Sequence, residues 1–192
     1  AVIQHRQALW IAKFARETEY SDPMAWEAVC LELARRAGIN IPQFELRRIG
    51  RGRSILLTER FDRVEGRRVG YVSAHSLTLK QDDYPSSYAS IAETISTSGA
   101  TARDDLHELF RRVALNLLVG NVDDHFRNHG FLRLSTGWAL SPVFDLEPNR
   151  RPDSVEATPI VEGGEREGRD IRELRDAHDV FDLTRGAAAQ II

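Results

Sequence analysis

The chain has little cysteine, little lysine and no long hydrophobic run. Its 192 residues include one cysteine, Cys30, and two lysines, Lys13 and Lys80. A lone cysteine excludes an internal disulfide and a cysteine-rich metal cluster, and it favours a reducing, cytoplasmic setting. Because no run of about 18 apolar residues and no signal peptide is found, we expect a soluble protein without a membrane segment.

Glycine is absent from the first part of the chain, and the first glycine is Gly38. A loop whose backbone closely approaches phosphate groups is ordinarily built with glycine, so residues 1–12 are not expected to form one. The chain also begins with Ala1 rather than Met, directly before an apolar strand. We therefore expect this sequence to be a fragment of a longer protein.

Charge of either sign is not in excess. The 26 Lys and Arg residues nearly balance the 29 Asp and Glu residues, which gives a net charge of −3. This balance argues against direct, extensive contact with nucleic acid. With 42% hydrophobic residues, the chain is long enough to bury a core, and we expect one globular unit of two unequal parts.

The most informative stretch of the chain is Asn-Val-Asp-Asp-His-Phe-Arg-Asn at 121–128, which is followed by Phe-Asp at 144–145. Asp123, Asn128 and Asp145 are the groups that phosphoryl transfer needs: a carboxylate orients the attacking hydroxyl, while an amide and a second carboxylate hold Mg²⁺. The spacing Asp-x-x-x-x-Asn is that of a protein-kinase catalytic loop. The same residue types also crowd into ordinary turns, so this spacing alone is weak.

The surroundings of this stretch strengthen the prediction. Apolar residues at steps of three and four predict a helix over 102–119, with Thr101 as its N-cap and Asp104 as a weak capping-box partner. Two strands, 130–134 and 138–140, are joined by a Ser-Thr-Gly turn. Helix, polar loop, hairpin and aspartate follow one another in the order found in kinases.

Upstream, the apolar run 9–14 predicts a short strand that contains Lys13. A lysine in such a strand usually lies at an edge or extends along the surface to reach water. The alternative is that its ammonium group points into a cleft and holds the phosphates of a nucleotide.

A helix follows, with Asp22 as N-cap, Pro23 in its first turn and Gly38 beyond its end. We expect its core-facing residues to be Trp26, Val29, Cys30, Leu33 and Ala37. Glu27 lies off that stripe, so it either faces solvent or turns towards Lys13. A strand lysine paired with a helix glutamate is the ion pair that positions nucleotide phosphates in kinases.

A third segment, 54–63, runs from an apolar strand into charged and aromatic residues without turn residues. It is either a strand leaving the core or a hinge between two lobes. In a hinge, the backbone groups of Glu59 and Phe61 would meet an adenine edge, and Asp62 would reach the ribose.

The chain resembles the HipA-type serine/threonine kinases, which are the toxins of bacterial toxin–antitoxin pairs. The matching strings, in chain order, are LWIAKF (9–14), EAVCLELA (27–34), LTERFDR (57–63), residues 121–131 and LSPVFDL (140–146). The resemblance implies an α+β, protein-kinase-like fold of two lobes. Residues 1–62 would form a partial, β-rich N-lobe, and residues 63–192 a mainly helical C-lobe.

The resemblance also implies roles for individual residues. Asp123 would be the catalytic base, Asn128 and Asp145 would bind Mg²⁺, and Lys13, paired with Glu27, would hold the phosphates of ATP.

The string Glu59-Arg60-Phe61-Asp62 would contact the nucleotide at the hinge. His125 would lie near the nucleotide, or else stabilise the loop by bonding to backbone. Asp124 has no catalytic duty in this scheme and would hold the loop through hydrogen bonds.

The resemblance further implies a protein substrate, for example an aminoacyl-tRNA synthetase. Any contact with nucleic acid would be made through a partner antitoxin with a DNA-binding fold. The Gly-rich loop of the family lies upstream of the residues present here, so we expect this chain to be weak or inactive alone. The kinase triplets His-Arg-Asp and Asp-Phe-Gly are replaced by residues 121–123 and 145–147, which makes activation by a phosphorylated loop doubtful.

Other classes of function stay open. An aminoglycoside-type phosphotransferase shares the Asp-x-x-x-x-Asn logic, and a pseudokinase would bind nucleotide or antitoxin without catalysis. A metallohydrolase using Asp123, Asp124 and His125 is weaker, because no second histidine cluster has metal-ligand spacing.

Overall fold

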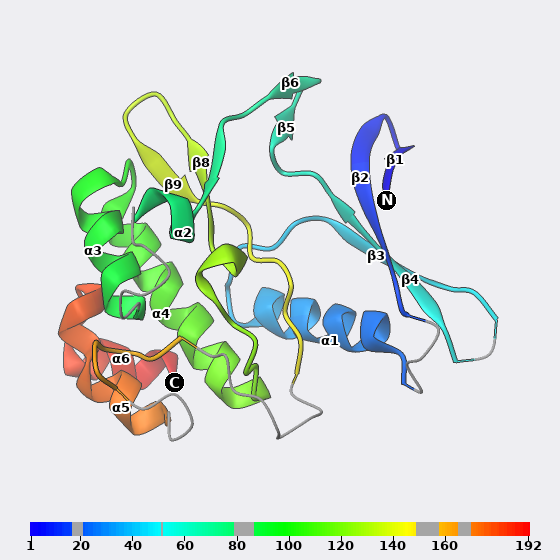
Figure 1. Ribbon diagram of the computed structural model, residues 1–192. Helices are drawn as coiled ribbons and strands as arrows, with labels where there is room; N and C mark the ends of the chain where they lie inside the picture. Colours follow the sequence, from blue (N-terminus) through cyan, green and yellow to red (C-terminus); the bar gives the residue numbers. More distant parts are fainter. Residues whose placement is uncertain (17–20, 51, 79–86, 149–157, 165–169) are drawn as a thin grey trace.

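The computed structural model describes residues 1–16, 21–50, 52–78, 87–148, 158–164 and 170–192. Both helices and strands are present, and they form a mixed α+β structure (Figure 1). The first half contains β1 (Val2–His5), β2 (Ala8–Phe14), α1 (Pro23–Arg36), β3 (Phe44–Arg48), β4 (Ser54–Glu59), β5 (Arg63–Val64), β6 (Arg67–Arg68), β7 (Tyr71–Ser73) and α2 (Ala74–Leu77). The second half contains α3 (Tyr88–Ser98), α4 (Ala102–Val119), the 3-10 helix η1 (Phe126–Asn128), β8 (Gly130–Arg133), β9 (Trp138–Leu140), α5 (Ile171–Asp176), the 3-10 helix η2 (His178–Phe181) and α6 (Arg185–Ile191).

Four antiparallel strands in the order β1-β2-β4-β3 form the main sheet. In β2, Trp10 and Ala12 are buried with Leu57 in a small cluster on one face. Successive side chains of a strand alternate between faces, so Leu9, Ile11 and Lys13 share the opposite face. Leu56 of β4, which lies opposite Lys13, packs there against α1.

Helix α1 begins as the sequence predicts, but it buries a different face. The Asp22 side chain accepts a hydrogen bond from the Ala25 amide (3.2 Å), with proline at the first helical position. The predicted core stripe was wrong except at Cys30, which is buried: Trp26, Val29, Leu33 and Ala37 are exposed. The buried residues of α1 are Met24, Glu27, Ala28, Cys30, Leu31 and Ala34. Small alanines let the helix approach β4 and the end of α4 closely, so a face with fewer large apolar residues becomes the buried one.

The larger hydrophobic core lies among α3, α4, η2 and α6, away from the sheet (Figure 1). Helix α4 has the predicted bounds, and Gly120 ends it in the left-handed conformation (φ 66°). The predicted capping box was wrong, since Thr101 makes no side-chain cap and its hydroxyl donates to Asp105 Oδ2 (3.0 Å).

A second, smaller sheet of β7, β8 and β9 brings two polar segments to one end. The hairpin of β8 and β9 is extended by a bond from the Ser141 amide to the Gly130 carbonyl (2.8 Å). Asn128 precedes this hairpin and Asp145 follows it, so the hairpin carries both to the same end of the small sheet.

Within the described ranges, no helix combines the length and apolar character needed to cross a membrane. Cys30 is buried, as expected for a packing residue.

Candidate functional site

Lys13 lies between two carboxylates. Its Nζ is 2.6 Å from Glu27 Oε1 and 2.7 Å from Asp145 Oδ1. These three residues come from β2, from α1 and from the segment after β9, so three distant parts of the chain meet at one ammonium group. Glu27 is 1% exposed, whereas the Asp145 side chain is 44% exposed. The choice left open for Glu27 is thereby settled: it turns inward and pairs with Lys13.

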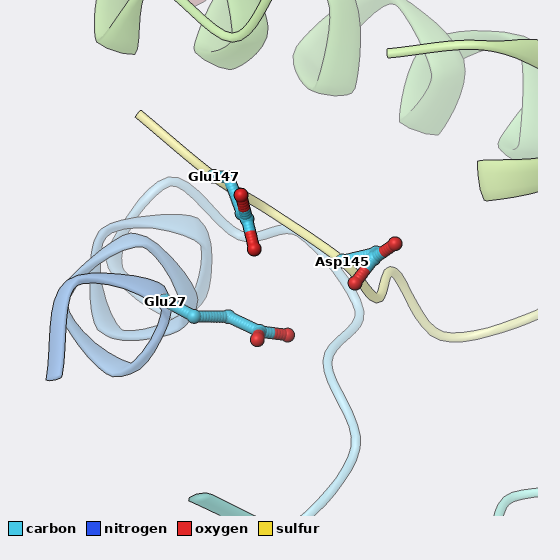
Figure 2. A group of neighbouring side chains, drawn as sticks. All are labelled: Glu27, Asp145 and Glu147. Carbon is cyan, nitrogen blue, oxygen red and sulfur yellow. The ribbon is translucent and has the colours of Figure 1, made fainter. Parts of the chain in front are cut away.

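A third carboxylate belongs to the same ion cluster, which we define as Lys13, Glu27, Asp145 and Glu147. The carboxylate oxygens of the three acids all lie within 4.8 Å of one another. Figure 2 shows Glu27 reaching from α1 towards the other two, which lie on the segment after β9. Within the described part of the chain, Glu27 Oε2 is buried and has no hydrogen-bond partner. The three carboxylates are thus close enough to one another to hold a metal ion together.

The pKa values of the paired groups are set by burial and by their neighbours. Burial lowers the pKa of Lys13, but Glu27 and Asp145 together outweigh it, so the net pKa is raised and the ammonium stays charged. Burial raises the pKa of Glu27, and Asp145 and Glu147 add to that rise, while Lys13 opposes it. Glu27 therefore depends on Lys13 for its charge.

Asp145 has an uncommon backbone conformation. Its φ is 61°, in the left-handed region that few residues other than glycine adopt, although Asp and Asn adopt it more readily than most. Such conformations cost about 1–3 kcal/mol and gather at functional sites.

The loop that carries Asp123 is held through its backbone. Asn121 Oδ1 accepts from the Asp123 amide (3.2 Å), and Asn128 Nδ2 donates to the Asp123 carbonyl (3.1 Å). Both asparagines are buried, whereas Asp123 is exposed. Since the nitrogen of the Asn128 amide is used inside the loop, its oxygen is the atom suited to a cation.

A buried loop network surrounds Asp124, which is 3% exposed. Asp124 Oδ2 accepts hydrogen bonds from Tyr88 and from Asn116 Nδ2 (2.7 Å), and it lies 3.2 Å from His129 Nε2. Asn116 in turn accepts from Asn121 Nδ2 (3.2 Å). The prediction that Asp124 holds the loop through hydrogen bonds is confirmed. We call these five residues the loop network.

Among the residues that the structure describes, the His125 imidazole has no hydrogen bond to backbone, which was one of the two alternatives considered for it. Its main-chain amide donates to the Asp123 carbonyl (3.1 Å), while Nδ1 of the ring is buried without a partner among the described residues. Asp124 is fully engaged by α3, α4 and His129. A metal bound jointly by Asp123, Asp124 and His125 is therefore disfavoured.

The predicted hinge forms an ion-paired turn after β4. Asp62 accepts two bonds from Arg60 (2.8 and 2.7 Å) and one from Arg63 (2.5 Å), and these arginines, Arg60 above all, lower its pKa. The Asp62 carboxylate thus has a local structural partner that the sequence did not indicate. The Phe61 ring lies 5.9 Å from the Phe144 ring, which joins the hinge to the residue before Asp145.

A cavity of about 360 Å³ lies at the other end of β2, lined in part by Gln4, Leu9, Glu59 and Arg60. None of the ion cluster lines it. Leu9 is four residues from Lys13 along the strand, or about 13 Å. Both side chains are on the same face of the sheet.

Two features were missed from the sequence. Glu147 follows Asp145 by two residues, but the left-handed backbone of Asp145 breaks the alternation of an extended segment, so spacing alone does not place the two carboxylates together. Asn116 and Tyr88 lie far from the loop in the sequence, and no local pattern indicates that they bond Asp124.

A strand lysine paired with a helix glutamate, and an aspartate that follows a hairpin beside an Asp-x-x-x-x-Asn loop, together resemble the phosphate-handling site of protein kinases. Comparison with known proteins agrees with this class. The chain belongs to the family of the HipA-like C-terminal domain, whose model matches residues 1–192.

Individual relatives are distant. The chain is 29% identical over 154 residues to a protein of Sinorhizobium fredii (strain NBRC 101917 / NGR234) named "Putative kinase Y4mE", a match that covers 71% of this chain and 33% of that protein. Its fold is similar to that of HipA from Shewanella oneidensis MR-1, solved with HipB and operator DNA (TM-score 0.72, 18% identity, 95% of this chain and 48% of that one). It is also similar to the Helicobacter pylori proinflammatory kinase CtkA (TM-score 0.61, 17% identity, 77% and 54%). The chain thus spans about a third to a half of these proteins.

Proposed function

We propose that this chain is the core of an ATP-dependent serine/threonine protein kinase of the HipA type. The observation that carries the proposal is the ion cluster, in which Lys13 bonds Glu27 and Asp145 at 2.6 and 2.7 Å. A lysine held in this way can contact the phosphates of a nucleotide, and the aspartate beside it can bind the accompanying metal ion.

The residues of the ion cluster and the loop fit Mg²⁺. This ion prefers hard oxygen ligands and usually uses one or two carboxylates together with substrate phosphates. Asp145 and the amide oxygen of Asn128 are the predicted ligands, and Glu147 adds a neighbouring carboxylate. When bound, Mg²⁺ would neutralise negative charge that develops on the transferred phosphoryl group.

In the proposed reaction, Asp123 accepts the proton of a substrate Ser or Thr hydroxyl. The hydroxyl oxygen forms a bond to the γ-phosphorus of ATP as the bond from that phosphorus to the β–γ bridging oxygen breaks, and ADP leaves with that oxygen. Lys13 keeps its positive charge throughout and stays on the phosphates. Asp123 suits the role of base because its backbone is fixed on both sides while its side chain is exposed.

The base of ATP would lie towards the cavity at Leu9 and Glu59. Leu9 and Ile11 are half-exposed on the face of the sheet that carries Lys13, and they offer apolar surface for a flat ring. The backbone of Glu59 and Phe61 is proposed to meet its edge. Residues 1–62 would then act as the N-lobe and residues 63–192 as the C-lobe of a kinase fold.

The wider biology follows from the family and is proposed with it. The protein would act as the toxin of a toxin–antitoxin pair in the cytoplasm. It would phosphorylate a protein of the translation machinery, for example an aminoacyl-tRNA synthetase, and would bind an antitoxin that contacts DNA.

A transfer assay tests the proposal. The full-length protein is incubated with Mg²⁺ and ATP carrying a labelled γ-phosphate, in the presence of cell extract proteins or of free sugars and aminoglycosides. Label on Ser or Thr of a protein, lost in Asp123→Asn, is the expected result. Label on small molecules alone would instead assign an aminoglycoside-type enzyme, and nucleotide binding without any transfer would assign a pseudokinase.

A further inference from the structure

A buried ion pair on α4 has no part in the reaction proposed above. Glu108 and Arg112 lie one helical turn apart, and Glu108 Oε1 accepts from Nε and Nη2 of Arg112 (3.0 and 2.9 Å). Arg112 is 1% exposed, and its Nη1 is buried without a partner in the described part of the chain. A buried pair of this kind is often no more stabilising than hydrophobic residues of similar size, so its contacts, rather than its stability, are the feature to explain.

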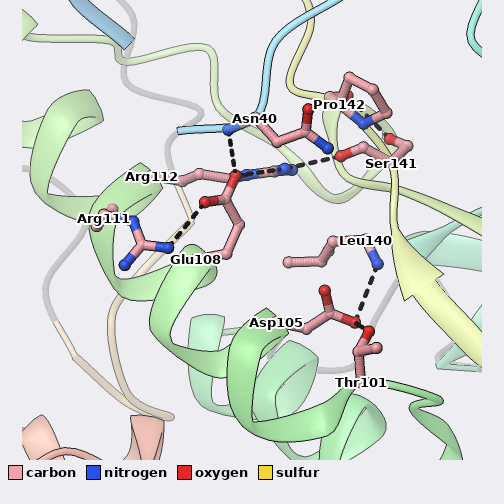
Figure 3. Close-up of polar contacts among 9 residues, drawn as sticks. All are labelled: Asn40, Thr101, Asp105, Glu108, Arg111, Arg112, Leu140, Ser141 and Pro142. Atoms are coloured by element: carbon pink, nitrogen blue, oxygen red, sulfur yellow. Dashed lines mark hydrogen bonds and ion pairs between the residues drawn. The ribbon is translucent and has the colours of Figure 1, made fainter. Parts of the chain in front are cut away.

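The pair joins two segments that are far apart in the sequence (Figure 3). Arg112 Nη2 donates to the Ser141 carbonyl (2.7 Å), and Glu108 Oε1 accepts from the Asn40 amide (2.9 Å). The Asn40 carbonyl accepts from the Val143 amide (2.8 Å), so Asn40 is bonded both to Glu108 and to the 141–143 segment. We call this set of hydrogen bonds the circuit. Asn40 lies just beyond α1, the helix that carries Glu27.

The two regions that these bonds connect, α1 and the segment after β9, also carry Glu27 and Asp145, the carboxylates that bond Lys13. Val143 is two residues before Asp145, so the circuit ends next to the residue whose backbone adopts the left-handed conformation. Bonds of 2.6 and 2.7 Å to one ammonium hold only if α1 and the 141–145 segment keep their relative positions. A functional site tolerates displacement of only about 0.5 Å.

We propose that Glu108 and Arg112 are positioning residues, which set Asp145 for metal binding by fixing residues 141–143 to the end of α1. The proposal rests on the kinase function proposed above. It predicts that loss of the pair weakens the Mg²⁺-dependent part of ATP binding more than it weakens the fold.

The test uses the 192-residue chain and three variants. Arg112→Gln removes the positive charge and the guanidinium group that donates through both Nε and Nη2. The double variant Glu108→Leu with Arg112→Met replaces the pair with hydrophobic residues of similar size. The backbone amide of Asn40, which loses its acceptor, can then donate to water because Asn40 is exposed. Phe181→Leu is the control: it weakens the distant helical core, where Phe181 packs on Phe110 (5.4 Å between ring centroids).

Two measurements are made on each protein: calorimetric ATP binding over a range of Mg²⁺ concentrations, and hydrogen exchange of the 141–146 amides without nucleotide. We expect both pair variants to need about tenfold more Mg²⁺ for half-maximal binding and to exchange faster at 141–146. Phe181→Leu should shift the Mg²⁺ midpoint less than twofold, even if its Tm falls as much as the Tm of the pair variants.

Unchanged midpoints and unchanged exchange in both pair variants would overturn the positioning role. If the unmodified chain shows no Mg²⁺-dependent ATP binding, the kinase proposal fails instead, and the exchange rates still decide whether the pair holds the segment. If neither pair variant folds, Arg112→Lys, which keeps the charge but loses the guanidinium group, is measured in the same way and judged by the same results.

Discussion

The ion cluster around Lys13 and the loop network around Asp124 are both polar, yet they are built differently. In the loop network, one buried carboxylate accepts from Tyr88 and Asn116 and faces His129. In the ion cluster, Lys13 bonds two carboxylates and a third lies close to them, while one buried oxygen of Glu27 lacks a partner among the described residues.

This difference indicates that the loop network maintains the shape of the loop, whereas the ion cluster is suited to binding a ligand. A network whose central carboxylate is fully engaged fixes the shape of the loop, because any movement would leave buried groups unpaired. A cluster of neighbouring carboxylates in which Asp145 is only partly buried can change partners when a ligand arrives. Adjacent residues of one loop differ in a similar way: Asp124 is buried within the loop network, whereas the Asp123 side chain is exposed.

The largest expected effect separates those two aspartates. Asp123→Asn should lower phosphoryl transfer by about 10²–10⁴, the usual contribution of a general base, because the amide accepts no proton. The unfolding midpoint should stay near that of the unmodified protein, since the side chain is exposed. Transfer rates and urea unfolding measure the two effects. Retention of most activity would remove Asp123 from the role of base.

Substitution of the neighbouring residue, Asp124, should lower the stability of the fold. Asp124→Ala leaves Tyr88, Asn116 and His129 without their shared acceptor, and each buried unpaired group costs about 1–3 kcal/mol. The free energy of unfolding, measured in urea, should therefore fall by about 3 kcal/mol or more. Asp123→Ala is the matched control and should change it by less than about 0.5 kcal/mol. Equal losses in the two alanine variants would contradict this difference between the two aspartates.

In the ion cluster, Lys13→Met should weaken stability in a pH-dependent way. Glu27, whose pKa burial already raises, loses the lysine that opposes the rise. Its folded pKa then lies further above the unfolded value, so the variant loses stability as pH rises between the two values and regains it as pH falls.

We expect a loss of about 3 kcal/mol at pH 8, the lower range for breaking a buried pair, and a clearly smaller loss near pH 5. Unfolding free energies of both proteins at the two pH values test this. Lys13→Met with Glu27→Gln is the control, and its stability should be nearly independent of pH in this range. A loss for Lys13→Met that is the same at both pH values would show that Glu27 carries no raised pKa.

The smallest effect is expected at Glu147, which is exposed. Glu147→Gln removes one of three negative charges near the metal position, and an exposed charge contributes about 0.2–1 kcal/mol. The Mg²⁺ concentration for half-maximal ATP binding should rise about twofold. Glu162→Gln, on a different segment of the chain, serves as the control. A tenfold rise would instead make Glu147 a direct ligand, and no rise would remove it from the site.

Much of this site was predictable from local sequence. The spacing of Asp123, Asn128 and Asp145 indicated a kinase-like loop and a following aspartate, and the bounds of α4 followed from its apolar periodicity. What could not be predicted depends on tertiary packing. In α1, Trp26 and Leu33 form an obvious apolar stripe, but the sheet packs on the face with small alanines.

Because of that difference, the direction of Glu27 could only be left open. The pairing of Asp62 with Arg60 and Arg63 was not predicted either, because the string at 59–63 favours contact with a nucleotide as much as pairing within the turn. The spacing of Glu108 and Arg112 on α4 permits a pair, but its burial and its backbone partners at 40 and 141 are set by the fold and leave no residue pattern.

The central claim is that Asp145, held beside Lys13, is the metal ligand of a nucleotide site. It is tested most directly by ATP affinity with and without Mg²⁺, measured by calorimetry on the unmodified chain and on Asp145→Asn. We predict that Mg²⁺ strengthens ATP binding to the unmodified chain about tenfold or more, and that Asp145→Asn loses this gain while it keeps the metal-free affinity. An equal gain from Mg²⁺ in both proteins would contradict the claim.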